Sequence, residues 1–149
     1  MPLAECPGPG EVRAAPRTPY AAELVGTNLF TGRLERLEAG AGRLVTSEGD
    51  VVVAWPPGID GALEPVIGLL RPADVSLHVR PPEGASARNV LAGTVTSVRV
   101  EGERARVRID ASPPVVADVT LGSVERLGIR EGIRLWASFK AVEVRVQAI

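Results

Sequence analysis

The sequence predicts an all-β protein with one or two short helices, built as two similar small barrels in tandem. From position 28 onward, apolar and polar residues alternate with a period of two, which is typical of strands that bury one face. The chain holds 16 Gly and 13 Pro residues, which supply turn signals between these segments. Apolar residues make up 45% of the chain and aromatic residues only 3%, so the core is expected to be aliphatic, as suits strands.

Residues 1–26 are expected to precede the barrels. Their first part is rich in Pro and Gly and is predicted to be a disordered tail. A short helix is predicted next, because Thr18 suits its N-cap, Pro19 its first position and Gly26 its end.

Two series of strands follow, with a turn-rich joint at 80–87 between them. In the first series, strands are predicted at 29–37, 42–47, 50–55, 65–70 and 74–79. In the second series, strands are predicted at 91–101, 104–110, 114–120 and 134–146, with a short helix at 123–129 before the last one.

The two series resemble each other, which predicts a tandem repeat. The segment "NLFTG" at 28–32 matches "NVLAG" at 89–93, an offset of 61. Further on, "VIGLLRPADVSL" from Val66 matches "LWASFKAVEVRV" from Leu135, an offset of 69. The difference of 8 fits the extra "LGSVERLG" of the second copy. We therefore predict a first module at 27–80 and a second at 81–149; chance similarity between two Val- and Leu-rich series is the alternative.

Composition indicates a soluble protein of a reducing compartment, and we expect it to be cytoplasmic. Cys6, the single cysteine, cannot form an intramolecular disulfide. No apolar run approaches the ~20 residues that span a bilayer. The opening "MPLAECPGPG" lacks the basic and apolar regions of a signal peptide.

Catalytic and metal-binding motifs are missing, so an enzyme is not expected. The sequence contains neither a GxxxxGK[ST] nor a GxGxxG phosphate-binding motif. His78, the only histidine, alternates with apolar residues and is interpreted as strand surface or edge. One Cys and one His cannot form a zinc site, and pairing Cys6 with His78 as a nucleophile is not expected either.

Charge separates the two halves. Residues 1–84 hold seven basic against eleven acidic side chains, a net of −4, whereas residues 85–149 hold ten against seven, a net of +3. The second half is therefore the one that could hold an anion, although most of its arginines occupy positions that are usually just solvated.

The second copy also concentrates hydrogen-bond donors. A tetrahedral oxyanion offers only acceptor oxygens, so its site needs hydroxyls, amides and cations, and it must keep carboxylates away. Ser86, Arg88 and Asn89 are such donors directly ahead of a strand. Thr120 and Ser123 flank a Gly just before the predicted helix, whose free N–H groups favour an anion.

Lys140 is a further candidate, because it is the only lysine beside sixteen arginines. An ammonium is a compact charge that suits a nearly spherical ion better than a planar guanidinium does. Strict alternation along 134–146 predicts that Lys140 shares a face with Trp136 and Ser138.

Each of these residues also has a plain structural interpretation. Ser86 and Asn89 suit a turn, Ser123 suits a helix N-cap, and Lys140 suits a solvated strand. The first copy argues for function, because it lacks most of the set. Val25 and Thr27 stand there in place of Ser86 and Arg88, and only Arg71, opposite Lys140, keeps the charge.

These segments carry a family resemblance. "SARNVLAGTV", "VVADVTLGSVERLGIREG" and "WASFKAVEV" appear in the order of the molbindin, or Mop/TOBE, domain, over about residues 85–146. The chain resembles the C-terminal regulatory region of the ATP-binding subunits of molybdate-type ABC transporters, without their ATPase domain. The resemblance implies tandem OB-like β-barrel modules that bind molybdate or tungstate, often at an interface between modules or subunits, with no covalent cofactor.

Carried over position by position, the resemblance implies a set of oxyanion-binding residues. The ligands would be Ser86, Arg88, Thr120, Ser123 and Lys140, with Ala87 and Asn89 in backbone or outer contacts. Two departures from the family pattern bear on affinity. Leu121 follows Thr120 where a basic residue is usual, and Phe139 replaces the usual Ile before Lys140.

The leading hypothesis is therefore a non-catalytic molybdate- or tungstate-binding regulatory module, expected to be a homo-oligomer, with a dimer favoured. Its expected partners are ATPase or permease subunits of an ABC transporter, which would place it at the inner face of the membrane. A structural dimerisation or docking module without ligand, and a stand-alone storage protein, are the alternatives. A nucleic-acid binder is not expected, because it would need aromatic stacking platforms and a basic groove.

Overall fold

The computed structural model describes residues 26–84 and 86–149. The predicted tail and the predicted helix after Thr18 lie outside this range. The described strands are β2 (Asn28–Glu38), β3 (Ala41–Thr46), β4 (Gly49–Ala54), β5 (Leu63–Leu70), β6 (Ser76–His78), β7 (Asn89–Glu101), β8 (Arg104–Asp110), β9 (Val115–Thr120), β10 (Arg134–Phe139) and β11 (Arg145–Ala148). The helical segments are α1 (Leu121–Leu127) and the 3₁₀ turns η2 (Pro72–Asp74) and η3 (Ala141–Glu143).

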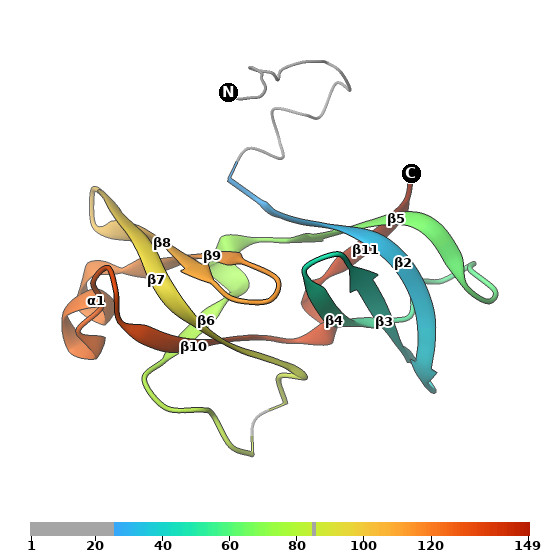
Figure 1. Cartoon of the computed structure of the whole chain (residues 1–149), viewed down its shortest axis with the longest axis horizontal. Helices are drawn as coiled ribbons and strands as arrows, with labels where there is room; N and C mark the ends of the chain where they lie inside the picture. Colours follow the sequence, from blue (N-terminus) through green and yellow to red (C-terminus); the bar gives the residue numbers. More distant parts are fainter. Residues whose placement is uncertain (1–25, 85) are drawn as a thin grey trace.

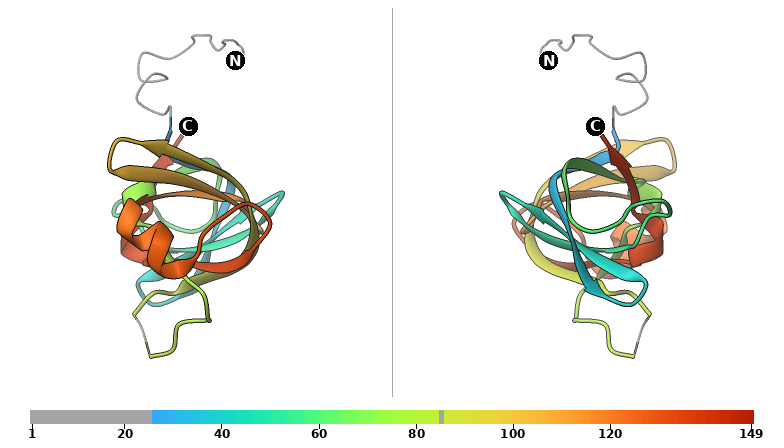
Figure 2. Two further views of the ribbon diagram at one scale, coloured as in Figure 1. Left: turned by 90° about the vertical axis from the view of Figure 1, so that its left-hand side faces the viewer. Right: turned by 90° about the vertical axis from the view of Figure 1, so that its right-hand side faces the viewer.

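The strands form two antiparallel sheets that lie end to end. One sheet has the order β11-β5-β2-β3-β4 and the other the order β6-β10-β7-β8-β9. Figure 1 shows the two lobes side by side along the long axis, with α1 at the far end of the second. Seen along that axis, each sheet curls around itself (Figure 2). The predicted all-β fold with OB-like barrels is confirmed, and the predicted repeat appears as two sheets of five strands each.

The two modules exchange their last strands. β6 ends the first series in sequence but pairs with β10 of the second sheet, where His78 lies opposite Trp136. β11 ends the second series but pairs with β5 of the first sheet, where Gln147 lies opposite Ile67. The sequence offset of 69 maps one of these pairs onto the other, so the exchange obeys the repeat. The limits 27–80 and 81–149 stay a prediction, and strand pairing crosses them at both ends.

This exchange corrects one predicted element. Residues 134–146 were expected to form one strand, but the 3₁₀ turn η3 divides them into β10 and β11, which belong to different sheets. Apolar residues occupy alternate positions up to Ala141 and then from Val142 onward, so the alternation shifts by one position at the turn, and the expectation of a single strand did not take this shift into account. By contrast, His78 lies half-buried on β6, an edge strand, as predicted.

One continuous apolar core joins the modules. It contains buried side chains from both sheets, among them Leu34, Leu44, Val107 and Leu135. At the junction, the rings of Phe30 and Phe139 stack with centroids 6.3 Å apart and planes 11° from parallel. Because exchanged strands and a shared core connect the two barrels, their relative placement is fixed by packing rather than by a linker.

Equivalent asparagines also fasten each module to the other. Asn28 donates from Nδ2 to the Val116 carbonyl (2.9 Å) and accepts from the Val116 N–H (2.8 Å). Asn89 forms the same pair of bonds with Val52, both 2.8 Å long. Each buried amide therefore continues the hydrogen bonding of a strand in the opposite sheet. Net stabilisation of about 1 kcal/mol per bond is typical.

The glycine shared by the two copies serves the fold as well. A Cβ at Gly93 would lie 2.7 Å from the Asp110 carbonyl oxygen, and a Cβ at Gly32 would meet the Val45 carbonyl. Only glycine allows the neighbouring strand to approach this closely. Within residues 26–84 and 86–149, no helix is long and apolar enough to cross a membrane.

Candidate functional site

Three of the predicted site residues line one open pocket of about 510 Å³ at the junction of the modules. Ser86 and Arg88 come from the segment that leads into β7, and Lys140 comes from the end of β10. The opposite wall consists of the β2–β3 turn and β4. The lining residues are Glu38, Ala39, Gly40, Ala41, Ala54, Ser86, Arg88, Lys140, Ala141 and Val142.

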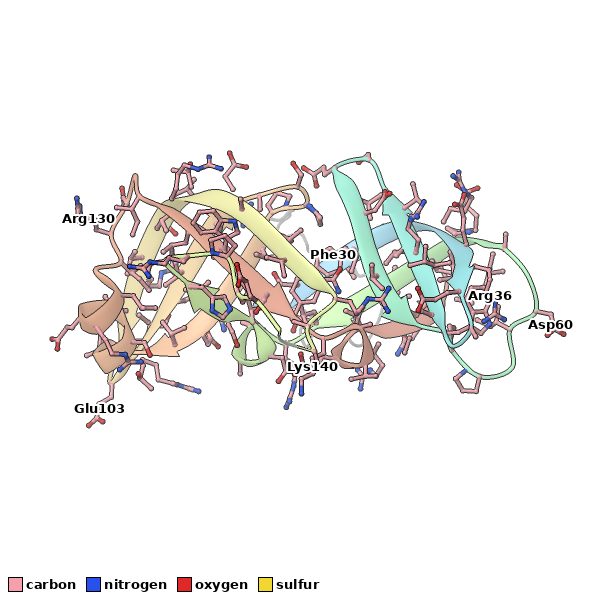
Figure 3. The ribbon with its side chains drawn as sticks, turned by 90° about the horizontal axis from the view of Figure 1, so that it is seen from below. Phe30, Arg36, Asp60, Glu103, Arg130 and Lys140 are labelled. Atoms are coloured by element: carbon pink, nitrogen blue, oxygen red, sulfur yellow. The ribbon has the colours of Figure 1, made fainter. Side chains whose placement is uncertain are left out.

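Lys140 lies just beyond β10, where the chain leaves the second sheet. Its backbone N–H donates to the Glu143 carboxylate (2.8 Å), so the acidic side chain holds the η3 turn and not the ammonium. The exposed Lys140 side chain forms no ion pair with any residue that the structure describes. Figure 3 shows it at the middle of the molecule, between the lobes.

The prediction that Lys140 shares a strand face with Trp136 and Ser138 is wrong. β10 ends at Phe139, so the alternation stops before Lys140. Ser138 is buried instead, and its hydroxyl lies 2.8 Å from His78 Nε2 across the β6–β10 pair. The physical reason is the strand exchange, which turns the chain from one sheet to the other at Lys140.

Arg88 reaches across the junction to a carboxylate of the first module. Its guanidinium donates to both oxygens of Glu38, at 3.1 Å and 3.4 Å. Both side chains are about half exposed, at 45% for Arg88 and 55% for Glu38. Arg88 is therefore at the pocket as predicted, but a carboxylate, the group an anion site should avoid, is there as well.

Asn89 and Ala87 stand apart from the pocket. Both polar atoms of the Asn89 side chain are engaged by the Val52 backbone, and Asn89 is only 4% exposed. Asn89 thus links the two modules, while its role as an outer contact of the anion stays a prediction, since the two bonds use only one of its two amide N–H groups. Ala87 is half-buried and does not line the pocket.

Thr120 and Ser123 lie elsewhere, at the start of α1. Thr120 is the N-cap, and its Oγ1 accepts from the Ser123 N–H (3.1 Å), so the alternative that Ser123 is the cap is wrong. Arg126 donates to the Ser123 hydroxyl at 3.3 Å. The Leu121 N–H bonds the Glu103 carbonyl (3.0 Å), and Figure 3 shows Glu103 at the end of the molecule remote from Lys140.

No residue of the first module was predicted to line the pocket. Glu38 stands fifty positions before Arg88, and nothing in its neighbourhood marks it as a site residue. Ala41 and Ala54 matter only because their small side chains leave the space open. The repeat itself was the one usable signal, since it predicts that two modules share a junction.

Chemically, the pocket can hold a small anion. Lys140 and Arg88 supply positive charge, and Ser86 supplies a hydroxyl donor. No group of three or more His, Cys, Asp or Glu side chains within the described ranges could hold a metal ion. The donors present are those expected for an oxyanion ligand.

The fold and this donor set agree with a family assignment. Residues 85–146 match the model of the TOBE domain. Residues 85–146 thus carry a TOBE domain, as the resemblance implied. The residues that the structure describes, 26–84 and 86–149, do not include an ATPase domain.

Relatives support the assignment and differ in what they import. The chain is 30% identical over 151 residues to the molybdenum import ATP-binding protein ModC of Mycobacterium tuberculosis, with 95% of this chain and 38% of that protein covered. It is 29% identical over 147 residues to the sulfate/thiosulfate import ATP-binding protein CysA of Ralstonia nicotianae, with 93% and 37% covered. The chain therefore spans well under half the length of these relatives.

A solved structure shows the same fold. The cytoplasmic molybdate-binding protein ModG, determined with molybdate bound, superposes with a TM-score of 0.70 at 21% identity. The match covers 82% of this chain and 96% of that one. Because the matched 82% of this chain exceeds the share of either sheet, the likeness extends over both sheets.

Proposed function

We propose that this chain is a non-catalytic module that binds molybdate or tungstate at the junction of its two barrels. The observation that carries the proposal is the meeting of Ser86, Arg88 and Lys140 in one pocket, although Ser86 and Lys140 are 54 positions apart in sequence. Two cations and a hydroxyl complement the charge and the acceptor oxygens of a tetrahedral dianion. Similarity to a molybdenum importer subunit supports this ligand class, and similarity to a sulfate importer subunit makes sulfate its natural competitor.

We further propose that a second copy completes the site. The resemblance implies that Thr120 and Ser123 also bind the anion, yet in one chain they lie with Glu103 at the far end of the second module. Only another chain can bring this pair beside Ser86, Arg88 and Lys140. A homodimer with shared sites would reconcile the implied ligand set with the geometry.

In a cell, the module would act on an ABC transporter. Anion binding would bias its ATPase subunits between two states, provided that the anion binds those states unequally. This role would place the protein in the cytoplasm, at the inner face of the membrane. The alternative of a stand-alone storage protein would use the same pocket.

A structural module without ligand is the second candidate, and the Arg88–Glu38 ion pair is the observation that favours it. The pair links the two modules directly and places a negative charge where an anion would bind. In this case the pocket residues would serve only to hold the junction together.

Calorimetric titration with molybdate, tungstate and sulfate separates the candidates. Lys140→Ala is expected to weaken binding by about 2 kcal/mol, or roughly thirtyfold, because it removes a cation that bonds the anion directly. Arg71→Ala removes one charge at the equivalent position of the first copy and is the matched control, expected to change affinity by less than about twofold.

Native mass spectrometry of the same samples reports the oligomeric state, which is expected to be a dimer with anion bound. Absence of heat with all three anions, or equal affinities of wild type and Lys140→Ala, would leave the structural candidate.

A further inference from the structure

Glu38 is directed into the pocket by an irregularity in β2. The register between β2 and β3 shifts between Arg36 and Glu38, and Glu38, the last residue of β2, pairs with Ala41. A bulge of this kind redirects the side chains that follow it. Gly40 then closes the turn with a φ of 78°, a conformation that favours glycine.

The arginine nearest in sequence leaves the Glu38 carboxylate available to Arg88. Arg36 stacks on the Trp55 ring, 3.8 Å from its centroid, and the backbone N–H of Trp55 donates to the Gly40 carbonyl (3.0 Å). Within the part of the chain that the structure describes, the one ion pair of Glu38 is the pair with Arg88 across the junction.

An oxyanion and the Glu38 carboxylate would therefore require the same partner. Both offer two oxygens in the geometry that a guanidinium fork accepts. A dianion at Arg88 would also lie within a few ångströms of the carboxylate, where like charges repel appreciably. The two groups cannot be bound by Arg88 together at full strength.

We propose that Glu38 is an internal competitor that sets the affinity and selectivity of the anion site, an inference that rests on the function proposed above. Its carboxylate occupies the Arg88 guanidinium, and an oxyanion binds by displacing it. The exchange is feasible because an exposed ion pair of this kind is weak. A divalent oxyanion, held by both Arg88 and Lys140, displaces the carboxylate more readily than a monovalent anion does.

The test is calorimetric titration of molybdate into the full chain carrying Glu38→Gln. The amide keeps the size of the side chain but removes the competing charge, so molybdate is expected to bind about tenfold more tightly. Asp60→Asn is the matched control, because it makes the same change in net charge at an exposed position at the outer end of the first module, remote from Lys140. Its affinity is expected to stay within about twofold of wild type.

A second background distinguishes competition for Arg88 from a general charge effect. In Arg88→Gln, the Glu38 carboxylate has lost its partner, so adding Glu38→Gln is expected to gain at most about twofold. An equal gain in both backgrounds would overturn competition for Arg88.

The control outcomes are distinct as well. If wild type binds molybdate and Glu38→Gln binds no more tightly, the competitor proposal is wrong while the proposed function stands. If neither wild type nor Glu38→Gln binds molybdate or tungstate, the proposed function itself fails, and the competitor proposal fails with it.

Discussion

The two copies of the repeat build the same junction twice but fill it differently. Asn28 and Asn89 make equivalent bonds to Val116 and Val52, so the residues two positions further on, Asp118 and Ala54, also correspond. Beside Asn89, the small Ala54 lines an open pocket. Beside Asn28, Asp118 occupies that place.

At the junction beside Asn28, an ion pair within the second module occupies the equivalent space. Arg106 donates to both oxygens of Asp118, at 2.9 Å and 3.0 Å, and this hydrogen bonding raises the pKa of the Arg106 guanidinium. The same guanidinium lies against Gly26, the counterpart of Ala87. This pair is better buried than Arg88–Glu38, with side chains 35% and 19% exposed against 45% and 55%.

Arg71 and Lys140, the equivalent cations where the chain changes sheets, also differ in whether a carboxylate pairs with their side chains. Arg71 forms a bidentate pair with Asp74, both bonds 3.0 Å long, and this raises the pKa of Arg71. Lys140 has the equivalent acid, Glu143, bound to its backbone N–H. The comparison teaches that the cations at one junction, Arg71 and Arg106, are paired with carboxylates, whereas the other junction keeps the Lys140 ammonium available.

The largest expected effect on stability tests whether the two shared asparagines are equivalent. Asn28→Ala and Asn89→Ala are each expected to lower the free energy of unfolding by about 2–4 kcal/mol. Each change removes two hydrogen bonds and leaves a backbone N–H and a backbone carbonyl without partners. Urea unfolding followed by tryptophan fluorescence measures this, with the exposed turn variant Ser47→Ala as control. A large loss in one variant and none in the other would contradict the equivalence of the two junctions.

A smaller effect would sharpen the contrast between the two ion pairs. Asp118→Ala is expected to cost about 1–2 kcal/mol of unfolding free energy, since it leaves the half-buried Arg106 without its partner. Glu38→Gln is expected to change it by less than about 0.5 kcal/mol, as is usual for an exposed pair. Equal costs in the same urea experiment would show that burial does not separate the two junctions.

The sequence was informative where a residue serves the fold locally. Period-two patterning located nearly every strand, and the repeated Asn and Gly marked positions that the structure assigns to the junction and to close strand approach. The shift of the apolar alternation at Ala141–Val142 marks a break at the η3 turn, but it could not show that the chain changes sheets there. Strand exchange depends on which of two strands, both distant in sequence, a segment pairs with, and the local pattern of apolar residues does not specify this pairing.

For the candidate site, the sequence located donors but not their assembly. Ser86, Arg88 and Lys140 meet in the pocket, whereas Thr120 and Ser123 lie with α1, because the order of residues along a strand series does not specify distances between its ends. Glu38 was missed for the same reason, since it belongs to the other module. The direction of the Glu38 side chain depends on a bulge in β2, and no feature of the sequence predicts that bulge.

The central claim is that the junction beside Asn89 binds the oxyanion and that the junction beside Asn28 does not. Anomalous scattering from tungsten in crystals grown with tungstate tests it most directly. We predict one tungsten position per chain, between the Arg88 guanidinium and the Lys140 ammonium, with Glu38 turned away and with Thr120 and Ser123 of a second copy close by. Tungsten beside Arg71 and Arg106, or at neither junction, would contradict the account.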